Sequence, residues 1–193
     1  AMAFARPLGE VAARWCSGDQ FGFIAGRSIW DAVMLFEAAA LHLARRDGDA
    51  ALIFVDFRAA FPSILHGWIK AVLIATGLPI SFVIAFLSFY ISVSAAVRFG
   101  SGSSSSFPML SGIRQGCPAS GTLFALAIDP CIRYIIHKMT PQRGVLTAYA
   151  DDVAAAVREL FEALPVLDRA FKVVGRCSAL ELHPGKVVVI PLW

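Results

Sequence analysis

The sequence has 193 residues, of which 58% are hydrophobic and only 16% are charged, and its formal net charge at pH 7 is +3. Because soluble domains typically have about 25% charged residues, this composition argues against intrinsic disorder and supplies ample apolar material for a buried core. The small positive charge is compatible with a nucleic-acid partner but does not indicate one by itself.

The cysteines and histidines are scattered along the chain. No CxxC and no HxxxH spacing occurs, which argues against a zinc site and a disulfide framework. Free thiols are typical of a reducing compartment, so an intracellular protein of the cytoplasm or nucleus is expected. The N-terminal segment has no signal-peptide pattern, so secretion is not expected. The residues concerned are Cys16, Cys117, Cys131, Cys177, His42, His66, His137 and His183.

The first half of the chain predicts helices around one short strand. Residues 28–46 carry apolar side chains at helical spacing, and residues 51–55 (ALIFV) form an apolar run that fits a buried strand. Pro62 can begin another helix, and two further helical stretches are expected after Pro79.

The second half predicts strands that alternate with helices. We expect, in this order, a strand, a flexible Gly/Ser-rich turn, a long helix, a β-hairpin, a helix and a final strand, at residues 91–99, 100–106, 119–139, 145–157, 159–176 and 186–193. This mixture predicts an α+β fold in which helices pack on one face of an antiparallel sheet.

Residues 71–97 contain no charged side chain, which leaves a second interpretation open. The run is long enough for a transmembrane helix. Gly77-Leu78-Pro79 interrupts it, however, in a pattern typical of one helix ending and another beginning. From this segment alone, a membrane span and a buried core both remain open.

Three aspartates stand where the predicted strands end. Asp151 and Asp152 are adjacent at the centre of the hairpin, and Asp56 directly follows the apolar strand. Adjacent carboxylates in an apolar setting are costly unless a cation neutralises them, and Asp is a hard oxygen ligand suited to Mg²⁺. Asp56 and Asp151 could hold two metal ions about 3.5–4 Å apart, as in-line attack of a hydroxyl on a nucleotide phosphate requires. Alternatively, Asp56 caps a helix and the adjacent pair forms a solvated turn.

Five motifs in the sequence resemble those of reverse transcriptases. They are GFIAGRS (22–28), FVDFRAAFPSI (54–64), SGIRQGCPASGTLF (111–124), AYADDVAAAV (148–157) and LELHPGK (180–186). Each motif is weak alone, but their order and spacing match and the set covers most of the chain. The sequence therefore resembles a fragment of the reverse transcriptase (RNA-directed DNA polymerase) domain of a non-LTR (LINE-type) retrotransposon.

The resemblance implies a right-hand polymerase fold, with a palm, partial fingers and no thumb. Residues 1–50 would be partial fingers and residues 51–193 the palm, with helices derived from the fingers at about 66–97. The implied enzyme adds dNTPs to a DNA primer on an RNA template by two-metal nucleotidyl transfer. The alternative is an inactive retroelement remnant with the same fold. Because it would have no thumb, the fragment alone is not expected to have strong activity. A membrane span would separate Asp56 from Asp151 and is no longer expected, and nothing indicates an oligomer.

The resemblance also implies roles for individual residues. Asp56 and Asp151 would bind two Mg²⁺ ions, for which Mn²⁺ can substitute, and Asp152 would support them. Phe61 would exclude the ribose 2′-hydroxyl, with core packing as the alternative. Asp129 lies outside the motifs and is expected to be structural. The other residues expected to contact dNTP, primer or template are Arg27, Arg58, Arg114, Gln115, Gly116, Tyr149 and Lys186. Their alternatives are a solvated arginine or lysine, a turn glycine and a core tyrosine.

Overall fold

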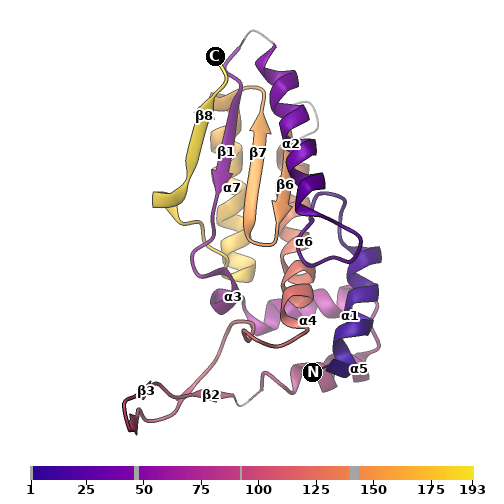
Figure 1. The fold of residues 1–193 in the computed structure, drawn as a ribbon, viewed down its shortest axis with the longest axis vertical. Coiled ribbons are helices and arrows are strands. Elements are labelled where there is room, and N and C mark those ends of the chain that lie inside the picture. The colour runs from indigo at the N-terminus through magenta and orange to yellow at the C-terminus, as the bar shows by residue number, and fades with distance from the viewer. Residues whose placement is uncertain (1, 46–47, 92, 140–143) are drawn as a thin grey trace.

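The structure, a computed structural model, describes residues 2–45, 48–91, 93–139 and 144–193. Its centre is a four-stranded antiparallel sheet with the strand order β6-β7-β1-β8 (Figure 1). The strands are β1 (Ala51–Val55), β6 (Gly144–Tyr149), β7 (Asp152–Val157) and β8 (Val188–Pro191). The predicted first strand, hairpin and final strand are therefore confirmed.

β1 occupies an inner position of the sheet because both of its edges are paired. Its alternate residues Ala51, Ile53 and Val55 are buried in the core, as period-two strand geometry requires. The antiparallel register pairs Val55 with Val153 of β7, so β1 ends beside the turn that joins β6 to β7. This register brings Asp56 and the adjacent aspartates of the hairpin to the same end of the sheet.

Two long helices, α6 (Ser120–Met139) and α7 (Leu160–Ser178), cover one face of the sheet (Figure 1). α6 is central to the core, since the continuous run Leu123–Asp129 is buried. α7 is amphipathic and buries residues at helical spacing, from Leu160 to Ser178. The predicted α+β fold, with helices packed on an antiparallel sheet, is confirmed.

A third helix, α2 (Ile29–Ala44), lies on the opposite face, beside β6 and β7 (Figure 1). The ring of Phe36 meets that of Phe54 in β1 edge-on, with centroids 5.4 Å apart. The predicted arrangement with helices on one face describes α6 and α7, and α2 adds partial cover on the other side. The predicted helix 28–46 is confirmed up to Ala44, and Arg46 lies outside the described residues.

The remaining helices lie below the sheet in Figure 1. They are α1 (Met2–Trp15), α3 (Ala60–Ser63), α4 (His66–Ala75) and α5 (Ile80–Leu87). The uncharged run 71–97 is divided among α4, α5 and the segment that follows, because Gly77 adopts a φ of +80° and Pro79 precedes a new helix. Within the described ranges, no helix is both long enough and apolar enough to cross a membrane.

Between α5 and α6 the chain forms a narrow arm that extends away from the sheet (Figure 1). Its short strands pair as β2 with β5 and β3 with β4. They are β2 (Ser94–Ala95), β3 (Arg98–Phe99), β4 (Gly102–Ser103) and β5 (Phe107–Pro108). The single strand predicted over 91–99 is thus broken into two pieces, and Ser92 lies outside the described residues. Two-stranded ribbons of this kind have little stability of their own.

Candidate active site

The β6–β7 hairpin closes through Ala150 and Asp151, which lie between the paired residues Tyr149 and Asp152. Ala150 has a φ of +58°, in the left-handed region that residues with a Cβ rarely adopt. Asp151 is half-buried and Asp152 is exposed. The turn therefore presents two adjacent carboxylates at the end of the sheet.

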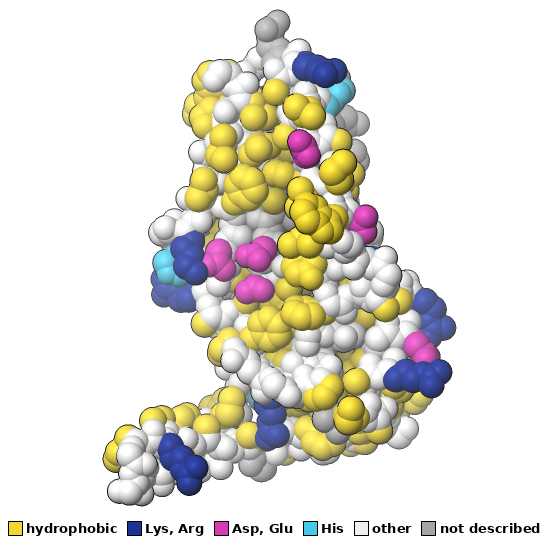
Figure 2. All heavy atoms as spheres, viewed as in Figure 1, with side chains coloured by type: hydrophobic (Ala, Val, Ile, Leu, Met, Phe, Trp, Pro, Cys, Tyr) yellow, Lys and Arg dark blue, Asp and Glu magenta, His cyan; other side chains and the backbone are white. Residues whose placement is uncertain are grey.

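Asp56 presents a third carboxylate at this end of the sheet, directly after β1. Figure 2 shows acidic side chains gathered there beside basic ones. Burial raises the pKa of the Asp151 carboxyl, and repulsion from Asp152 and Asp56 raises it further, while Lys186 opposes the shift. The three carboxylates therefore act on one another although 95 positions separate Asp56 from Asp151 in the sequence.

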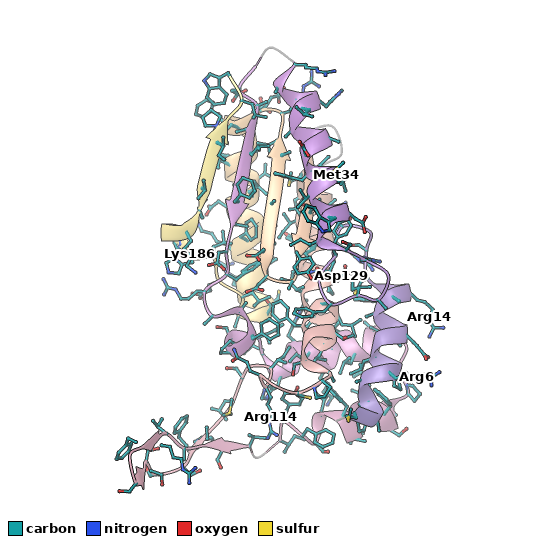
Figure 3. All side chains as sticks on the ribbon, in the orientation of Figure 1. Arg6, Arg14, Met34, Arg114, Asp129 and Lys186 are labelled. Atoms are coloured by element: carbon teal, nitrogen blue, oxygen red, sulfur yellow. The ribbon has the colours of Figure 1, made fainter. Side chains whose placement is uncertain are left out.

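Lys186 joins this group from the loop before β8 (Figure 3). Its Nζ lies 2.5 Å from Oδ2 of Asp56, and this contact raises the pKa of the lysine. The loop is held beside Asp56 by backbone hydrogen bonds, since the His183 N–H donates to the Asp56 carbonyl at 2.9 Å and the Arg58 N–H donates to the Glu181 carbonyl at 2.7 Å. Lys186 is therefore an exposed lysine that forms an ion pair with Asp56 in the acidic group.

The acidic group suits a magnesium ion in its donor chemistry. All three side chains offer hard carboxylate oxygens, and their repulsion is the kind that a bound cation relieves. Within the described part of the chain, no three His, Cys, Asp or Glu side chains converge closely enough to hold a metal ion as they stand. Oδ2 of Asp56 is engaged by Lys186, so a metal ion at Asp56 would share this carboxylate with the ammonium or displace it.

Phe61 lies on the short helix α3 and contacts two other aromatic rings. It stacks on Phe124 of α6, with ring centroids 4.2 Å apart and 14° between the planes, and meets Phe23 edge-on at 6.3 Å. The side chain is half-buried. Packing therefore fixes the ring on one side, as the core alternative expected, and leaves part of it accessible.

Arg114, Gln115 and Gly116 are exposed and lie just before α6. Gly116 has a φ of +81°, and a Cβ added there would meet no atom within 4 Å, so its conformation and not a close neighbour explains the glycine. Figure 3 shows Arg114 near the arm, well away from Lys186. The structure does not bring Arg114 to the three carboxylates.

The two remaining arginines differ in their surroundings. Arg27 donates to the carbonyl oxygen of Cys16 at 2.9 Å and also to those of Ser17 and Gln20. Its guanidinium is thus directed at the backbone of its own segment, where it fixes the loop, and the predicted contact with template or nucleotide stays a prediction. Arg58 is exposed, and its backbone N–H is held by the Glu181 carbonyl.

Tyr149 lines a groove between α2 and the sheet, with a volume of about 590 Å³. The walls are mainly apolar, with Phe36 and Phe54 among them, and Asp152 also lines the groove. The tyrosine is half-buried, so it lies beside the acidic turn and contributes to packing at the same time.

Gln20 was not predicted from the sequence; it is completely buried and hydrogen-bonded to Ala150 of the acidic turn. The reason for Gly22 was not predicted either: a Cβ there would lie 2.3 Å from the Ala150 nitrogen. The sequence signal for Gln20 was an uncharged polar residue two positions before the GFIAGRS motif. As expected, Asp129 is structural: it is fully buried, and its carboxylate accepts from the Ser17 N–H at 2.8 Å.

Known proteins resemble the chain in both sequence and fold. Residues 5–191 match the family model for reverse transcriptase (RNA-dependent DNA polymerase). The chain is 32% identical over 170 residues to the transposon TX1 uncharacterized 149 kDa protein of Xenopus laevis, a match that covers 84% of this chain and 13% of that protein.

Two solved telomerase structures share the fold over 98% of this chain. Telomerase from Candida albicans in complex with the TWJ fragment of telomeric RNA has a TM-score of 0.77 at 10% identity, with 34% of that chain covered. Apo telomerase from Candida tropicalis truncated from its C-terminal domain has a TM-score of 0.75 at 11% identity, with 40% covered. This chain thus spans less than half the length of the proteins it matches, and at such identity the structural likeness shows the fold alone.

The match over residues 5–191 agrees with the five sequence motifs, and the similarity to a transposon protein agrees with the retrotransposon branch that they indicated. The chain belongs to the reverse transcriptase (RNA-dependent DNA polymerase) family.

Proposed function

We propose that the chain forms the nucleotidyl-transfer centre of an RNA-directed DNA polymerase, which adds dNTPs to the 3′-hydroxyl of a primer. The observation that carries this proposal is the meeting of Asp56, Asp151 and Asp152 at one end of the sheet, where burial and, after it, repulsion from the other two carboxylates raise the pKa of Asp151. Three carboxylates beside one lysine have an excess of negative charge, which favours a divalent cation.

Asp56 and Asp151 would hold two Mg²⁺ ions, or Mn²⁺ in their place, with Asp152 in support. When bound, the ions supply charge neutralisation at the triphosphate and a lower pKa for the primer hydroxyl. The sheet holds the aspartates in position, because β1 and the β6–β7 hairpin are paired along their whole length. Lys186 brings a cation that can bind phosphate oxygens once it leaves Asp56. The half-buried ring of Phe61 would limit the space for a ribose 2′-hydroxyl.

The proposed partners are an RNA template and a DNA primer. A telomerase with the same fold has been solved in complex with a fragment of telomeric RNA, which supports an RNA partner for this fold. The exposed residues Arg58, Arg114 and Gln115 would contact the strands or the dNTP. We further propose that residues 1–50 are partial fingers and residues 51–193 the palm, with the helices at about 66–97 derived from the fingers.

Primer extension on an RNA template with dNTPs and Mg²⁺ tests the proposal. Asp151→Asn keeps the size of the side chain and removes its charge, so extension should fall by about 100-fold or more. Asp168→Asn is the matched control, because Asp168 is exposed on α7 and paired with Lys172. Extension that is unchanged by Asp151→Asn contradicts the proposal.

The same assay separates an active enzyme from an inactive remnant of a retroelement. A remnant would fold and bind Mn²⁺ at the carboxylates yet extend no primer on any template. Extension by the chain that depends on Asp56 and Asp151 would exclude the remnant.

A further inference from the structure

Gln20 is a polar residue buried completely beside the acidic turn, with 0% of its surface exposed. Its Oε1 accepts hydrogen bonds from the N–H of Ala150 at 2.9 Å and of Gly22 at 2.7 Å, and its Nε2 donates to the Ala150 carbonyl at 3.3 Å. The orientation of the amide follows from these partners, since two donors face its oxygen and an acceptor faces its nitrogen. One side chain thus satisfies both backbone groups of the residue before Asp151.

The backbone around Gln20 runs beside β6 and brings its side chain to the turn. The Phe21 N–H donates to the Ala148 carbonyl at 2.8 Å, and the Ala148 N–H donates to the Asp19 carbonyl at 2.8 Å. Gln20 and Ala148 thereby form a parallel bridge. Gly22 allows this approach, because any Cβ there would collide with the backbone of the turn.

The far end of this segment is fixed independently of the turn. The Ser17 N–H donates to the buried carboxylate of Asp129 at 2.8 Å, and Arg133 donates to the same carboxylate at 2.6 Å. Arg27 donates to carbonyl oxygens at 16, 17 and 20. The segment that carries Gln20 is therefore fixed by these contacts, so its side chain can hold the turn in one conformation.

The turn needs such a support because Ala150 has a φ of +58°, in the left-handed region that is unfavourable for an alanine. The hydrogen bonds of Gln20 hold this conformation and with it the directions in which Asp151 and Asp152 leave the backbone. A neutral amide suits the position, because a carboxylate would lose the donor to the Ala150 carbonyl and would add a negative charge beside the acidic group.

We propose that Gln20 is a positioning residue, whose amide holds Ala150 so that Asp151 and Asp152 can share a divalent cation with Asp56. This inference rests on the proposed function of the three aspartates. It extends the site to a residue outside the motifs that carry the carboxylates.

Gln20→Met tests the inference, because methionine has a similar length and shape but neither donates nor accepts in the same way. In the 193-residue chain, the dissociation constant for Mn²⁺, measured by electron paramagnetic resonance, should rise by about 10-fold or more, the size typical of residues that orient metal ligands. Hydrogen exchange of the Ala150 amide should become faster. Where primer extension is measured, kcat should fall more than the KM for dNTP rises, since the change acts on the metal ligands.

Two further variants separate positioning from general loss of stability. Val83→Ala removes buried packing on α5, outside the segment that carries Gln20, so it should lower the melting temperature while Mn²⁺ affinity stays within about twofold. If Gln20→Met does not fold, Gln20→Asn takes its place, because its amide is one carbon too short to reach Ala150 and it should show the same weaker Mn²⁺ binding.

The inference is overturned if a folded Gln20 variant binds Mn²⁺ as tightly as the unmodified chain, or if Mn²⁺ binding only follows the melting temperature across all variants. If the unmodified chain neither binds Mn²⁺ nor extends a primer, the proposed function has failed. The exchange of the Ala150 amide still decides whether Gln20 holds the turn, and an unchanged rate in Gln20→Met would overturn that role on its own.

Discussion

The ammonium of Lys186 lies 2.5 Å from the carboxylate of Asp56, 130 positions earlier in the sequence. The lysine is exposed and sits on the short 3₁₀ turn before β8, whose pairing with β1 brings the two residues together. Asp56 thus has a cation beside it within the chain itself, at the place where a metal ion would bind. In the proposed site, the ion pair and the metal ion would compete for this carboxylate.

Lys186→Met should therefore strengthen Mn²⁺ binding by the chain without nucleotide. We expect roughly a two- to fivefold lower dissociation constant, the effect of removing one exposed competing charge. Primer extension should nevertheless decrease, because the cation for the triphosphate is lost. Lys172→Met is the matched control, since Lys172 forms an exposed ion pair with Asp168 on α7. Weaker Mn²⁺ binding in Lys186→Met would show that the lysine assists the ion.

Gly22→Ala should destabilise the fold and disturb the acidic turn. A Cβ at this position would lie 2.3 Å from the nitrogen and 3.0 Å from the Cα of Ala150, and the paired backbone of β6 and β7 cannot easily move away. We expect a loss of about 1–3 kcal/mol, or roughly 3–10 °C in melting temperature for a chain of this size. Mn²⁺ binding should weaken as well.

Gly9→Ala provides the contrasting substitution for Gly22→Ala. Gly9 lies inside α1, and a Cβ there would meet no atom within 4 Å. Alanine should therefore stabilise the helix by up to about 1 kcal/mol. Equal melting temperatures for the two variants would contradict the role that the contact with Ala150 gives to Gly22.

The sequence predicted those parts of the fold that depend on local pattern. The hairpin around Asp151, the strand before Asp56 and the long helix through Asp129 all follow from periodicity and turn residues. Contacts between residues far apart in the sequence determined the other parts of the fold. The position of α2 on the second face of the sheet, and the contact of Gln20 with Ala150, depend on neighbours about 100 or more positions away. No local pattern encodes such contacts.

For the candidate site too, the sequence predicted some features, and packing between distant segments determined the others. The three aspartates were predicted from their charge in an apolar setting and from the motif resemblance, but neither predicted that Lys186 would contact Asp56 or that Arg27 would bind backbone carbonyls. A long cationic side chain can reach several partners, and only the path of the backbone selects one. The polar residue Gln20 was missed because a glutamine carries no charge to mark it.

As the pH is lowered, Mn²⁺ binding should weaken at a higher pH than it would if Asp151 had the ordinary pKa of an aspartate. Burial and the repulsion from Asp152 and Asp56 raise the pKa of Asp151 above its usual value of 3.8, and only the ionised carboxylate binds a cation. Affinity should therefore decline as the pH falls through the raised pKa of Asp151. In Asp152→Asn, which removes one of the repelling charges, the decline should move to lower pH. A titration of Mn²⁺ affinity between pH 4 and pH 7 measures both midpoints, and an unchanged midpoint would contradict the coupling.

Asp151→Asn should stabilise the chain at neutral pH, although the proposed function predicts that it removes activity. Since the folded pKa of Asp151 is raised, the folded chain holds more protons than the unfolded chain between pH 3.8 and that raised value. Stability therefore falls as the pH rises through this window, and the ionised carboxylate is a constant cost above it. We expect a melting temperature higher by roughly 1–3 °C at pH 7, with the difference shrinking toward pH 4. A lower melting temperature at pH 7 would mean that the ionised Asp151 is stabilised by its neighbours.

Phe61→Val should weaken the discrimination between dNTPs and NTPs. The ring is held by stacking on Phe124 at 4.2 Å, so it forms a fixed wall, and a smaller side chain leaves room for a 2′-hydroxyl. We expect the ratio of kcat/KM for dNTP over NTP to fall by about 10-fold, which corresponds to about 1.4 kcal/mol of discrimination. Phe124→Leu is the control for packing, because Phe124 is fully buried and its loss should lower the melting temperature while the ratio changes much less. If both variants change the ratio equally, the aromatic pair acts as a unit of the core, and Phe61 has no separate part in selecting the sugar.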